Sequence, residues 1–281
     1  MHDEQQFKQF IERIHLRHEI GEWLEQFSRA INGDEQSMVN IALLYKEQRF
    51  FPEMYDWLNK AVSLQCAEAM YELANCYFEA LDGKGNEKDA FEFYKKAAQL
   101  QHPDAMNNLA DMYFNGEGTE LNEGLALHWF TKAADRDVVE AMYTLGIMYE
   151  QGLGTEEDEA TAITYYERAA NGGYDEALYR MGMIYFAGEL GQKQDEQCAV
   201  KWFLKAAQQF HVDAIFNLGY CYENGLGVEQ NSAEAIRYYK QASMLGDIEA
   251  SKKLADLYED ISLEEAAKWR EKVQQLENES L

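Results

Sequence analysis

Apolar residues recur at helical spacing along most of this chain. In the segment AMYTLGIMYEQGLGT, residues 141–155, a wheel drawn at about 100° per residue places Ala141, Leu145, Met148 and Tyr149 on one face. A Gly-Leu-Gly sequence follows this helix, whereas phosphate-binding glycine loops follow a buried strand. The glycines are therefore predicted to end the helix. The first takes a left-handed conformation, and the second opens the turn to the next helix.

The same segment returns along the chain as a repeat. A tyrosine stands eight residues after the small residue that opens each copy, and successive copies are 32, 36, 36, 36, 37 and 36 residues apart. A period of this length is typical of a solenoid, in which each unit packs on its neighbours. The opening residues are Ser37, Ala69, Ala105, Ala141, Ala177, Ala214 and Ala250.

A second helix is predicted in each unit. It carries a bulky pair followed by small residues, and large side chains that face small ones let two antiparallel helices pack closely. We expect these bulky pairs to belong to the core. They occur in WLNKAV at Trp57, FYKKAA at Phe93, WFTKAA at Trp129, YYERAA at Tyr165, WFLKAA at Trp202 and YYKQAS at Tyr238.

Together the two helices resemble a known repeat. The pattern A-x-x-x-L-[GA]-x-x-Y-x-x-G-x-G, then an acidic or polar loop, then [WY]-[FY]-x-[KR]-A-A, is similar to the Sel1-like repeat, a relative of the tetratricopeptide repeat. The resemblance covers roughly residues 34–274. It implies an all-α fold, a right-handed α-α superhelix (solenoid) of about seven helix-turn-helix repeats with an N-terminal capping helix.

The two ends depart from the pattern, as capping units of a solenoid do. Residues 1–36 are expected to form an N-terminal helical cap, with Trp23, Phe27 and Ile31 on one helix face. Residues 37–274 hold the repeats, which start near 37, 69, 105, 141, 177, 214 and 250. SLEE at 262–265 is a capping box that opens a last helix, and residues 275–281 are expected to be a C-terminal tail.

Charge narrows the choice of partners. The chain has 51 acidic and 25 basic residues, a formal net charge of −26. Such a field repels nucleic-acid phosphates and anionic lipids, so neither nucleic acid nor a membrane is expected as a partner. It speeds encounter with a cationic protein, although an acidic surface also serves solubility. The sequence shows no signal-peptide pattern and no stretch as long as a membrane span, so a cytoplasmic location is expected.

A second stripe on the first helices is the candidate binding site. In a tetratricopeptide-like stack the first helices line the concave side, so the resemblance places this stripe in a groove. The stripe is most apolar in the units opened by Ala141, Ala177 and Ala214, so its centre is expected there. Aromatic residues beside acids suit a helix or peptide that carries Arg or Lys, although neighbouring first helices could also cover the stripe. The candidate residues are Tyr71, Asn107, Asp111, Glu140, Tyr143, Ile147, Glu176, Tyr179, Met183, Phe186, Asp213, Phe216 and Tyr220.

Motifs for catalysis are missing from the sequence. No GxxxxGK[ST], GxSxG, SxxK or HExxH occurs, and the four cysteines form no CxxC pair. His15 and His18 could share a metal ion with Glu12 or Glu19, but a polar cap helix also explains them. We therefore expect no catalytic residue, no metal site and no cofactor.

Three classes of function remain. The resemblance implies a protein–protein interaction scaffold or adaptor that binds a partner, expected to be cationic, in the concave groove. An alternative is a cytoplasmic immunity or inhibitor protein that neutralises a secreted bacterial toxin or effector, which the net charge of −26 allows. A second alternative is a hydrolase with paired carboxylates, although no nucleophile, base and orienting group are apparent together.

Overall fold

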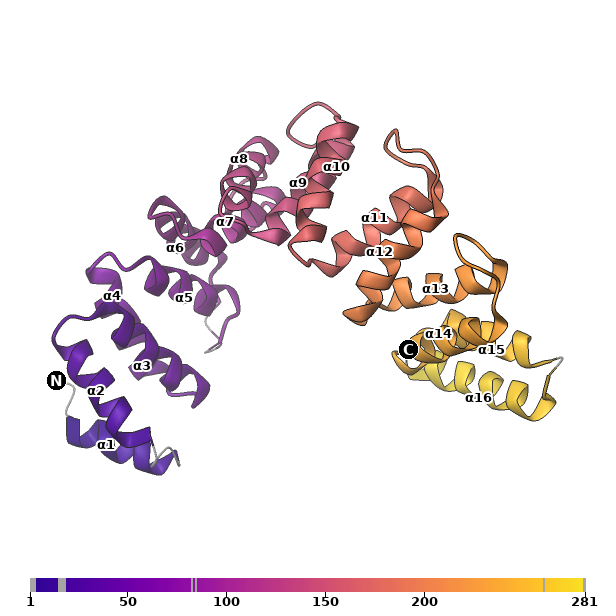
Figure 1. Cartoon of the computed structure of the whole chain (residues 1–281). Helices are drawn as coiled ribbons and strands as arrows, with labels where there is room; N and C mark the ends of the chain where they lie inside the picture. Colours follow the sequence, from indigo (N-terminus) through magenta and orange to yellow (C-terminus); the bar gives the residue numbers. More distant parts are fainter. Residues whose placement is uncertain (1–3, 15–18, 82, 84, 260, 280–281) are drawn as a thin grey trace. The chain divides into compact units, whose positions relative to one another are not determined.

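The structure, a computed structural model, describes residues 4–14, 19–81, 83, 85–259 and 261–279. In this part of the chain the regular structure consists of sixteen helices with no strand (Figure 1). The all-α prediction is thereby confirmed. The chain divides into two compact units, Met1–Val138 and Val139–Leu281, each built from helix pairs.

The first unit contains an N-terminal cap and three repeats. Two helices precede the first repeat, where a single capping helix was expected. The ring of Phe27 stacks on Phe7 with centroids 4.6 Å apart and meets Trp57 edge-on at 5.8 Å. Ile31, expected on the same apolar face, is instead 56% exposed. The helices are α1 (Glu4–Arg13), α2 (Ile20–Ile31), α3 (Glu35–Glu47), α4 (Phe51–Ser63), α5 (Ala67–Phe78), α6 (Glu87–Gln99), α7 (Pro103–Asn115) and α8 (Glu123–Ala134).

The second unit contains four repeats, and its last helix is longer than the sequence suggests. Residues 275–279, assigned above to a C-terminal tail, continue α16, where Leu276 is buried. The helices are α9 (Val139–Gln151), α10 (Glu159–Asn171), α11 (Asp175–Ala187), α12 (Glu196–Gln208), α13 (Val212–Asn224), α14 (Ser232–Met244), α15 (Ile248–Glu259) and α16 (Leu263–Glu279).

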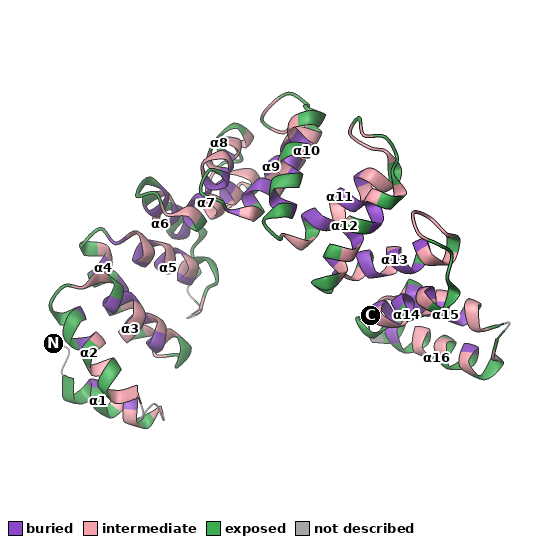
Figure 2. Ribbon diagram, in the orientation of Figure 1, coloured by how far each residue is buried: buried purple, intermediate pink, exposed green. Residues whose placement is uncertain are grey.

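Within a repeat, the first helix packs against an inner ring of the second helix. Tyr166 lies over Gly146 and Phe203 over Gly182, where an added Cβ would come within 2.5 and 2.4 Å of the ring. These residues are buried, and buried positions follow the helix faces that meet their neighbours (Figure 2). The predicted packing of large on small residues is therefore present.

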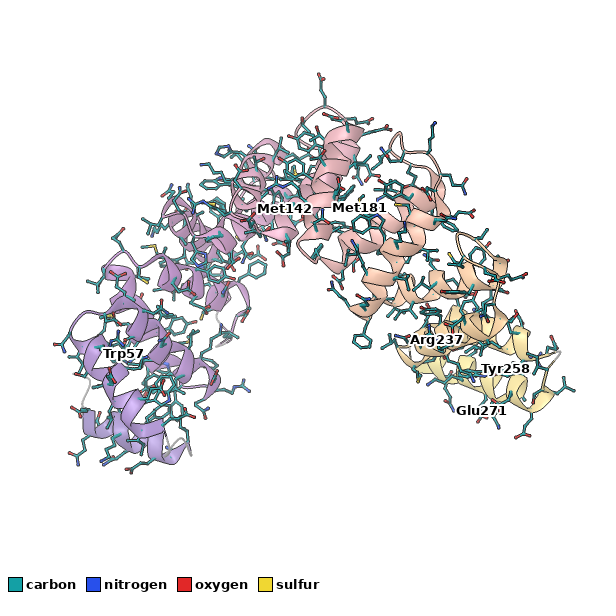
Figure 3. All side chains as sticks on the ribbon, viewed as in Figure 1. Trp57, Met142, Met181, Arg237, Tyr258 and Glu271 are labelled. Atoms are coloured by element: carbon teal, nitrogen blue, oxygen red, sulfur yellow. The ribbon has the colours of Figure 1, made fainter. Side chains whose placement is uncertain are left out.

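The outer ring of the bulky pair differs from the core position expected for it. Trp129 and Trp202 are only half-buried. The ammonium groups of Lys132 and Lys205 lie over these rings, 4.4 and 3.9 Å from their centroids. Trp57, which is labelled in Figure 3, and Tyr238 are buried, as expected. Most outer rings thus carry a cation–π contact on the second-helix surface, because the lysine three residues later reaches back over the ring.

The glycine pair after α13 has two tasks. The first glycine ends the helix in the left-handed conformation, as predicted; Gly225, with φ of 72°, is the C-cap of α13. The second, Gly227, was expected to open the turn to the next helix. It has φ of 69°, and an added Cβ would lie 2.3 Å from the carbonyl oxygen of Glu196. This glycine therefore also lets the loop press against the preceding repeat, at the start of α12.

The turn from each second helix to the next repeat also needs a left-handed residue. Gly173 and Gly246 supply it in two turns, whereas Gln101, Asp137 and Phe210 adopt positive φ in others. Phe210 has φ of 64° and is 66% exposed. A side chain in this conformation is strained, and the exposed ring of Phe210 gains little packing in return.

Candidate interaction surface on the first helices

The first helices of the second unit touch one another in sequence. Arg180 of α11 reaches Glu150 of α9, Asn217 of α13 donates to Met183 Sδ of α11 at 3.5 Å, and Lys253 of α15 reaches Glu223 of α13. The candidate residues of α9, α11 and α13 therefore share one surface, here named the first-helix face. It consists of Glu140, Tyr143, Ile147, Glu176, Tyr179, Met183, Phe186, Asp213, Phe216 and Tyr220.

A row of half-buried rings runs along the first-helix face. Tyr143 lies between Tyr166 and Tyr174, with centroids 5.5 and 5.3 Å away. Phe216 packs on Tyr239 at 5.4 Å. Ile147, Met183 and Phe186 are also half-buried, and Tyr220 is 37% exposed. Neighbouring elements thus cover one side of these side chains and leave the other side accessible.

Tyr179 is held by a histidine from the loop before the next first helix. Its ring stacks on His211 with centroids 4.5 Å apart. The backbone N–H of Ala214 donates to His211 Nδ1 at 3.3 Å, and His211 Nε2 lies 3.3 Å from a carboxylate oxygen of Glu176. The imidazole therefore presents its Nε2 proton to Glu176 and fixes the position of the Tyr179 ring.

Carboxylates border the rings where the first helices begin. Glu140, Glu176 and Asp213 lie in the first turns of α9, α11 and α13 and are exposed. In the described part of the chain, no salt bridge joins Glu140 or Asp213 to a cation. Each acid offsets the positive end of its helix dipole. Their charges also remain available to a cation that approaches the rings.

Hydrogen bonds and ion pairs that the sequence did not reveal join successive first helices. Each such group of contacts around one glutamate is here called a polar lock. The Tyr166 hydroxyl donates to Glu150 at 2.6 Å, and Arg180 donates to Glu150 at 2.6 Å and to Glu189 at 2.5 Å. Burial, together with the hydrogen bond to Glu150, raises the pKa of the Tyr166 phenol, so the hydroxyl remains a donor. Glu150 is thus a structural partner of Tyr166 and Arg180.

A second lock repeats this arrangement in α13 and α15. The Tyr239 hydroxyl donates to Glu223 at 2.6 Å, and Lys253 Nζ lies 3.2 Å from the same carboxylate. In the repeats where the inner ring is phenylalanine, another phenylalanine replaces the acid. The pairs are Phe130 with Phe114 at 6.4 Å and Phe203 with Phe186 at 6.1 Å. The sequence signal is a glutamate nine residues after an opening residue whose repeat has an inner tyrosine.

The first unit contains the remaining candidates, on α5 and α7. Tyr71 stacks on His102 at 4.5 Å, and His102 Nε2 lies 3.0 Å from Glu68, which repeats the Tyr179 arrangement. Asn107 donates to Asp111 at 3.0 Å. Burial, followed by the charge of Glu117, raises the pKa of Asp111 to about 6.

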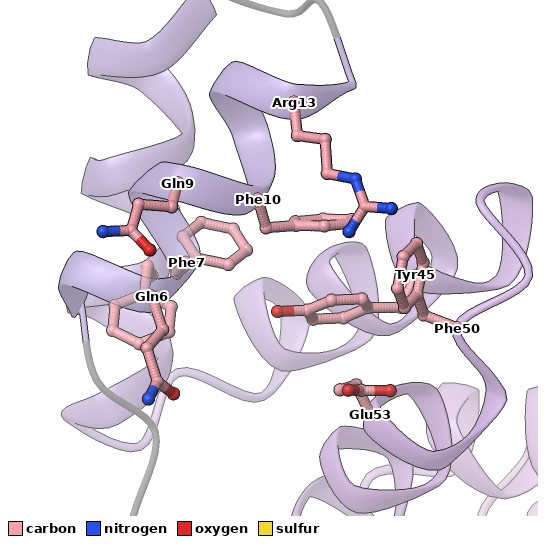
Figure 4. Close-up of a pocket in the computed structure, with 9 residues that line it drawn as sticks. Gln6, Phe7, Gln9, Phe10, Arg13, Tyr45, Phe50 and Glu53 are labelled. Carbon is pink, nitrogen blue, oxygen red and sulfur yellow. The ribbon is translucent and has the colours of Figure 1, made fainter.

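A separate hollow of about 350 Å³ lies beside α1 and α3 (Figure 4). Phe10 stacks on Tyr45 with centroids 4.5 Å apart, and Phe50 meets Phe10 edge-on at 5.3 Å. Burial, with a smaller effect of the Glu53 charge, raises the pKa of Tyr45 to about 12. These stacked rings join the N-terminal cap to the first repeat.

The family of the chain follows from its repeats. Five segments match the family described as Sel1 repeat, at residues 67–102, 103–138, 139–174, 175–209 and 212–247. The chain belongs to the Sel1 repeat family. Sel1 repeats are protein-interaction scaffolds and are generally non-enzymatic. The helix pairs α3–α4 and α15–α16 lie outside the matched segments, in line with the atypical end units of a solenoid.

Solved structures show the same fold. A protective antigen present in uropathogenic Escherichia coli strains, displaying an SLR fold, has a TM-score of 0.85 and 23% identity, covering 90% of this chain and 56% of that chain. A Sel1 repeat protein from Oxalobacter formigenes has a TM-score of 0.75 and 29% identity, covering 84% and 99%. This Sel1 chain thus spans little more than half of the antigen.

The remaining comparisons do not bear on the function of the chain. The immunity protein Pa5087 from Pseudomonas aeruginosa has 25% identity over 75% of this chain and 80% of that chain, but its TM-score of 0.46 is too low to carry an inference. A comparison with curated proteins finds no match. His15 and His18 lie outside the described residues. Elsewhere, the described residues contain neither a cluster of three or more potential metal ligands nor a helix apolar and long enough to span a bilayer.

Proposed function

We propose that this Sel1 repeat chain is a scaffold or adaptor that binds a protein partner in the concave groove of its first helices. The main support for this proposal is the first-helix face, where the half-buried rings of Tyr143, Tyr179 and Phe216 lie beside exposed carboxylates. Rings anchored on one side lose little conformational freedom when a partner covers them, so they suit binding hot spots. We also propose that the chain catalyses no reaction.

The distribution of charge between the two helices of a repeat supports a partner with basic residues. The single cation of α9, α11 and α13 is Arg180, which Glu150 and Glu189 already hold. The paired second helices α10, α12 and α14 instead carry Arg168, Lys201, Lys205, Arg237 and Lys240. These second helices also carry acids, such as Glu167 and Glu234, so their charges are mixed. A basic segment would therefore meet a stronger negative charge on the first-helix face than on the second helices.

An immunity or inhibitor protein is a narrower form of the same proposal. Such a protein would bind a cationic toxin with the same acidic and aromatic face. The two forms of the proposal therefore differ in the partner and share the binding surface. Identification of the partner therefore separates the general adaptor from the toxin-neutralising form.

The test is affinity capture from the native host, followed by mass spectrometry. Wild-type chain should enrich a protein that the double variant Tyr179→Ala/Phe216→Ala fails to enrich. Lys132→Glu, on the second-helix surface, is the matched control and should capture the protein normally. Capture that survives the double substitution but is lost with Lys132→Glu would place the site on the second helices and refute the proposal. A secreted toxin as the captured protein would select the immunity form.

A further inference from the structure

A cavity of about 310 Å³ lies on the first helices of the first unit, between α5 and α7. Tyr71, Tyr94 and the 46% exposed Phe78 supply its aromatic walls. Asp111 and Glu117 line it as well, and no lysine or arginine belongs to the lining. This volume suits a small group or one long side chain, and it is too small for a helix.

The repeat identifies the same place in the second unit, where it is filled. A shift of 72 residues, two repeats of 36, carries Tyr94 onto Tyr166, Asn108 onto Arg180 and Glu117 onto Glu189. At the second location the guanidinium of Arg180 bonds to Glu189 and Glu150 and lies 5.8 Å from the Tyr166 ring centroid. The first unit keeps the inner tyrosine and the loop glutamate, but it has the shorter Asn108 in place of the arginine. The same shift places Phe78 where Glu150 stands and Asp111 where Met183 stands, so the second carboxylate of the first location comes from α7.

A third copy of this location also holds a cation. Lys253 of α15 lies 3.2 Å from Glu223 and 5.8 Å from the ring centroid of Tyr220. Two of the three locations that contain an inner tyrosine are therefore occupied by the chain's own basic side chain. The α5–α7 location has space where those side chains lie.

The unfilled location carries an electrostatic cost. Asp111 is desolvated beside Glu117, and these two effects raise its pKa to about 6. Neither α5 nor α7 contains a lysine or arginine, and the nearby Lys46 of α3 pairs with Glu72 at 3.3 Å. A cation placed between Asp111 and Glu117 would relieve this repulsion.

We propose that the α5–α7 cavity binds an arginine side chain of a protein partner, with the guanidinium between Asp111 and Glu117 and beside the Tyr94 ring. The proposal deepens the function proposed above and rests on it for its partner. Arginine fits better than lysine because its planar fork can bond two carboxylates and pack against aromatic rings at once. The occupant is thus the equivalent of Arg180, supplied by another molecule.

The test uses N-acetyl-arginine methylamide as the probe and the ¹⁵N-labelled full chain. Titration to millimolar concentration should give saturable amide shifts confined to α5, α7 and the loop of Glu117. The citrulline analogue, equal in shape but neutral, should bind at least about tenfold more weakly because the charge-assisted hydrogen bonds are lost. Equal shifts from both probes, or no saturable shift from the arginine probe, would overturn the proposal.

Two variants make the test independent of folding defects. Asn108→Arg should fill the cavity as Arg180 does, abolish the arginine response and keep the helical content. Glu117→Gln should weaken the response without filling the cavity. A folded Asn108→Arg chain that still responds in α5 and α7 contradicts the assignment. In a folded Arg180→Asn chain, new shifts should appear in α9 and α11, and their absence contradicts the equivalence of the two locations.

Failure of this proposal and of the proposed function can be told apart. If the arginine probe fails to bind while partner capture still depends on Tyr179 and Phe216, the cavity assignment is wrong and the scaffold function stands. If the probe binds as expected but capture ignores every first-helix substitution, the cavity binds arginine and the scaffold proposal is wrong.

Discussion

Arg180 of α11 holds Glu150 of α9 through an ion pair of 2.6 Å between side chains that are 22% and 24% exposed. Because these two helices open successive repeats, the pair joins one repeat to the next. In a solenoid each repeat depends on its neighbours for stability, so contacts of this kind contribute to holding the stack together.

Replacing Arg180 should destabilise the chain more than replacing an exposed arginine. In Arg180→Met the half-buried Glu150 and Glu189 lose their cation, and we expect the free energy of unfolding to fall by about 2 kcal/mol. The control Arg237→Met removes a pair with Glu234 on the exposed surface and should cost less than about 1 kcal/mol. Urea denaturation followed by circular dichroism measures both. Equal losses in the two variants would show that the ion pairs of Arg180 stabilise the chain no more than an exposed ion pair does.

The two glycines after α13 should differ in their tolerance of alanine. Both have positive φ, so each substitution costs about 1 kcal/mol of backbone strain. Gly227→Ala adds a clash with the Glu196 backbone, whereas Gly225→Ala meets Gln230 Cβ at 3.3 Å. We expect Gly227→Ala to cost about 2 kcal/mol more in thermal or urea unfolding. A smaller loss for Gly227→Ala than for Gly225→Ala would contradict the close approach of the loop to α12.

Phe210→Gly should stabilise the chain. The substitution removes left-handed strain of about 1–2 kcal/mol, part of which is offset by the greater freedom of glycine in the unfolded state. A net gain of about 0.5–1 kcal/mol is expected, measured by urea denaturation. Gly246→Ala is the reverse control: its φ is 100° with open space around it, and it should destabilise. A loss of stability in Phe210→Gly would show that the exposed ring makes a contact that stabilises the folded state.

Asp111 should make the unfolding free energy depend on pH. Its pKa rises from 3.8 to about 6 on folding, so the folded state is favoured below pH 4 and loses this advantage as the pH rises through 6. Asp111→Asn should therefore raise the free energy of unfolding by about 1–3 kcal/mol at pH 7.5 and bring no such gain at pH 4. Asp256→Asn, at the same repeat position but exposed, is the control. A pH-independent difference between Asp111→Asn and wild type would refute the shift.

Aromatic and acidic residues of the first-helix face should affect partner binding in different ways. Tyr179→Ala or Phe216→Ala should weaken the affinity for a purified partner by about 2 kcal/mol or more, with helical content unchanged. Glu140→Lys should slow association and flatten its salt dependence, because border charges act mainly on encounter. Glu176→Lys should do the same and also disturb the Tyr179 ring, because Glu176 holds His211. Surface plasmon resonance at several salt concentrations separates the two effects. Unchanged dissociation rates in both aromatic variants would exclude these rings as anchors.

The sequence predicts the fold well because its determining signals are local. The repeat period, the small residues opposite bulky ones and the left-handed glycine at Gly225 lie within one helix pair or its turn. The N-terminal cap is less predictable, because its two helices do not follow the repeat. Phe7 and Ile11, four residues apart and both buried, are the local sign of α1. In the same way, the apolar and buried Leu276 is the local sign that α16 continues beyond residue 274.

The candidate surface is less predictable because its contacts join distant segments. A wheel separates Tyr179 from the core face of α11, but the ring of His211 that holds it comes from the next repeat. Glu150 and Arg180 lie thirty residues apart, so neither helix alone shows that they meet. Aligning the repeats position by position reveals the lock, and the same alignment shows that Asn108 replaces its cation.

The match between the inner ring and the residue beside it has a consequence for protein engineering. Tyr166 and Tyr239 come with Glu150 and Glu223, whereas Phe203 comes with Phe186. These repeats are thus two kinds of cassette, one with a hydroxyl–carboxylate pair and one with a ring-on-ring pair. The repeat of Tyr94 belongs to neither kind, because it has Phe78 at the position of the acid and its hydroxyl donates to Asn75. Arrays lengthened with whole cassettes keep every phenol and carboxylate satisfied, provided that the cassette after a glutamate brings its own arginine or lysine. Chimeras that exchange only one member of such a pair would leave a buried hydroxyl without an acceptor, or an acid without a cation, at the junction.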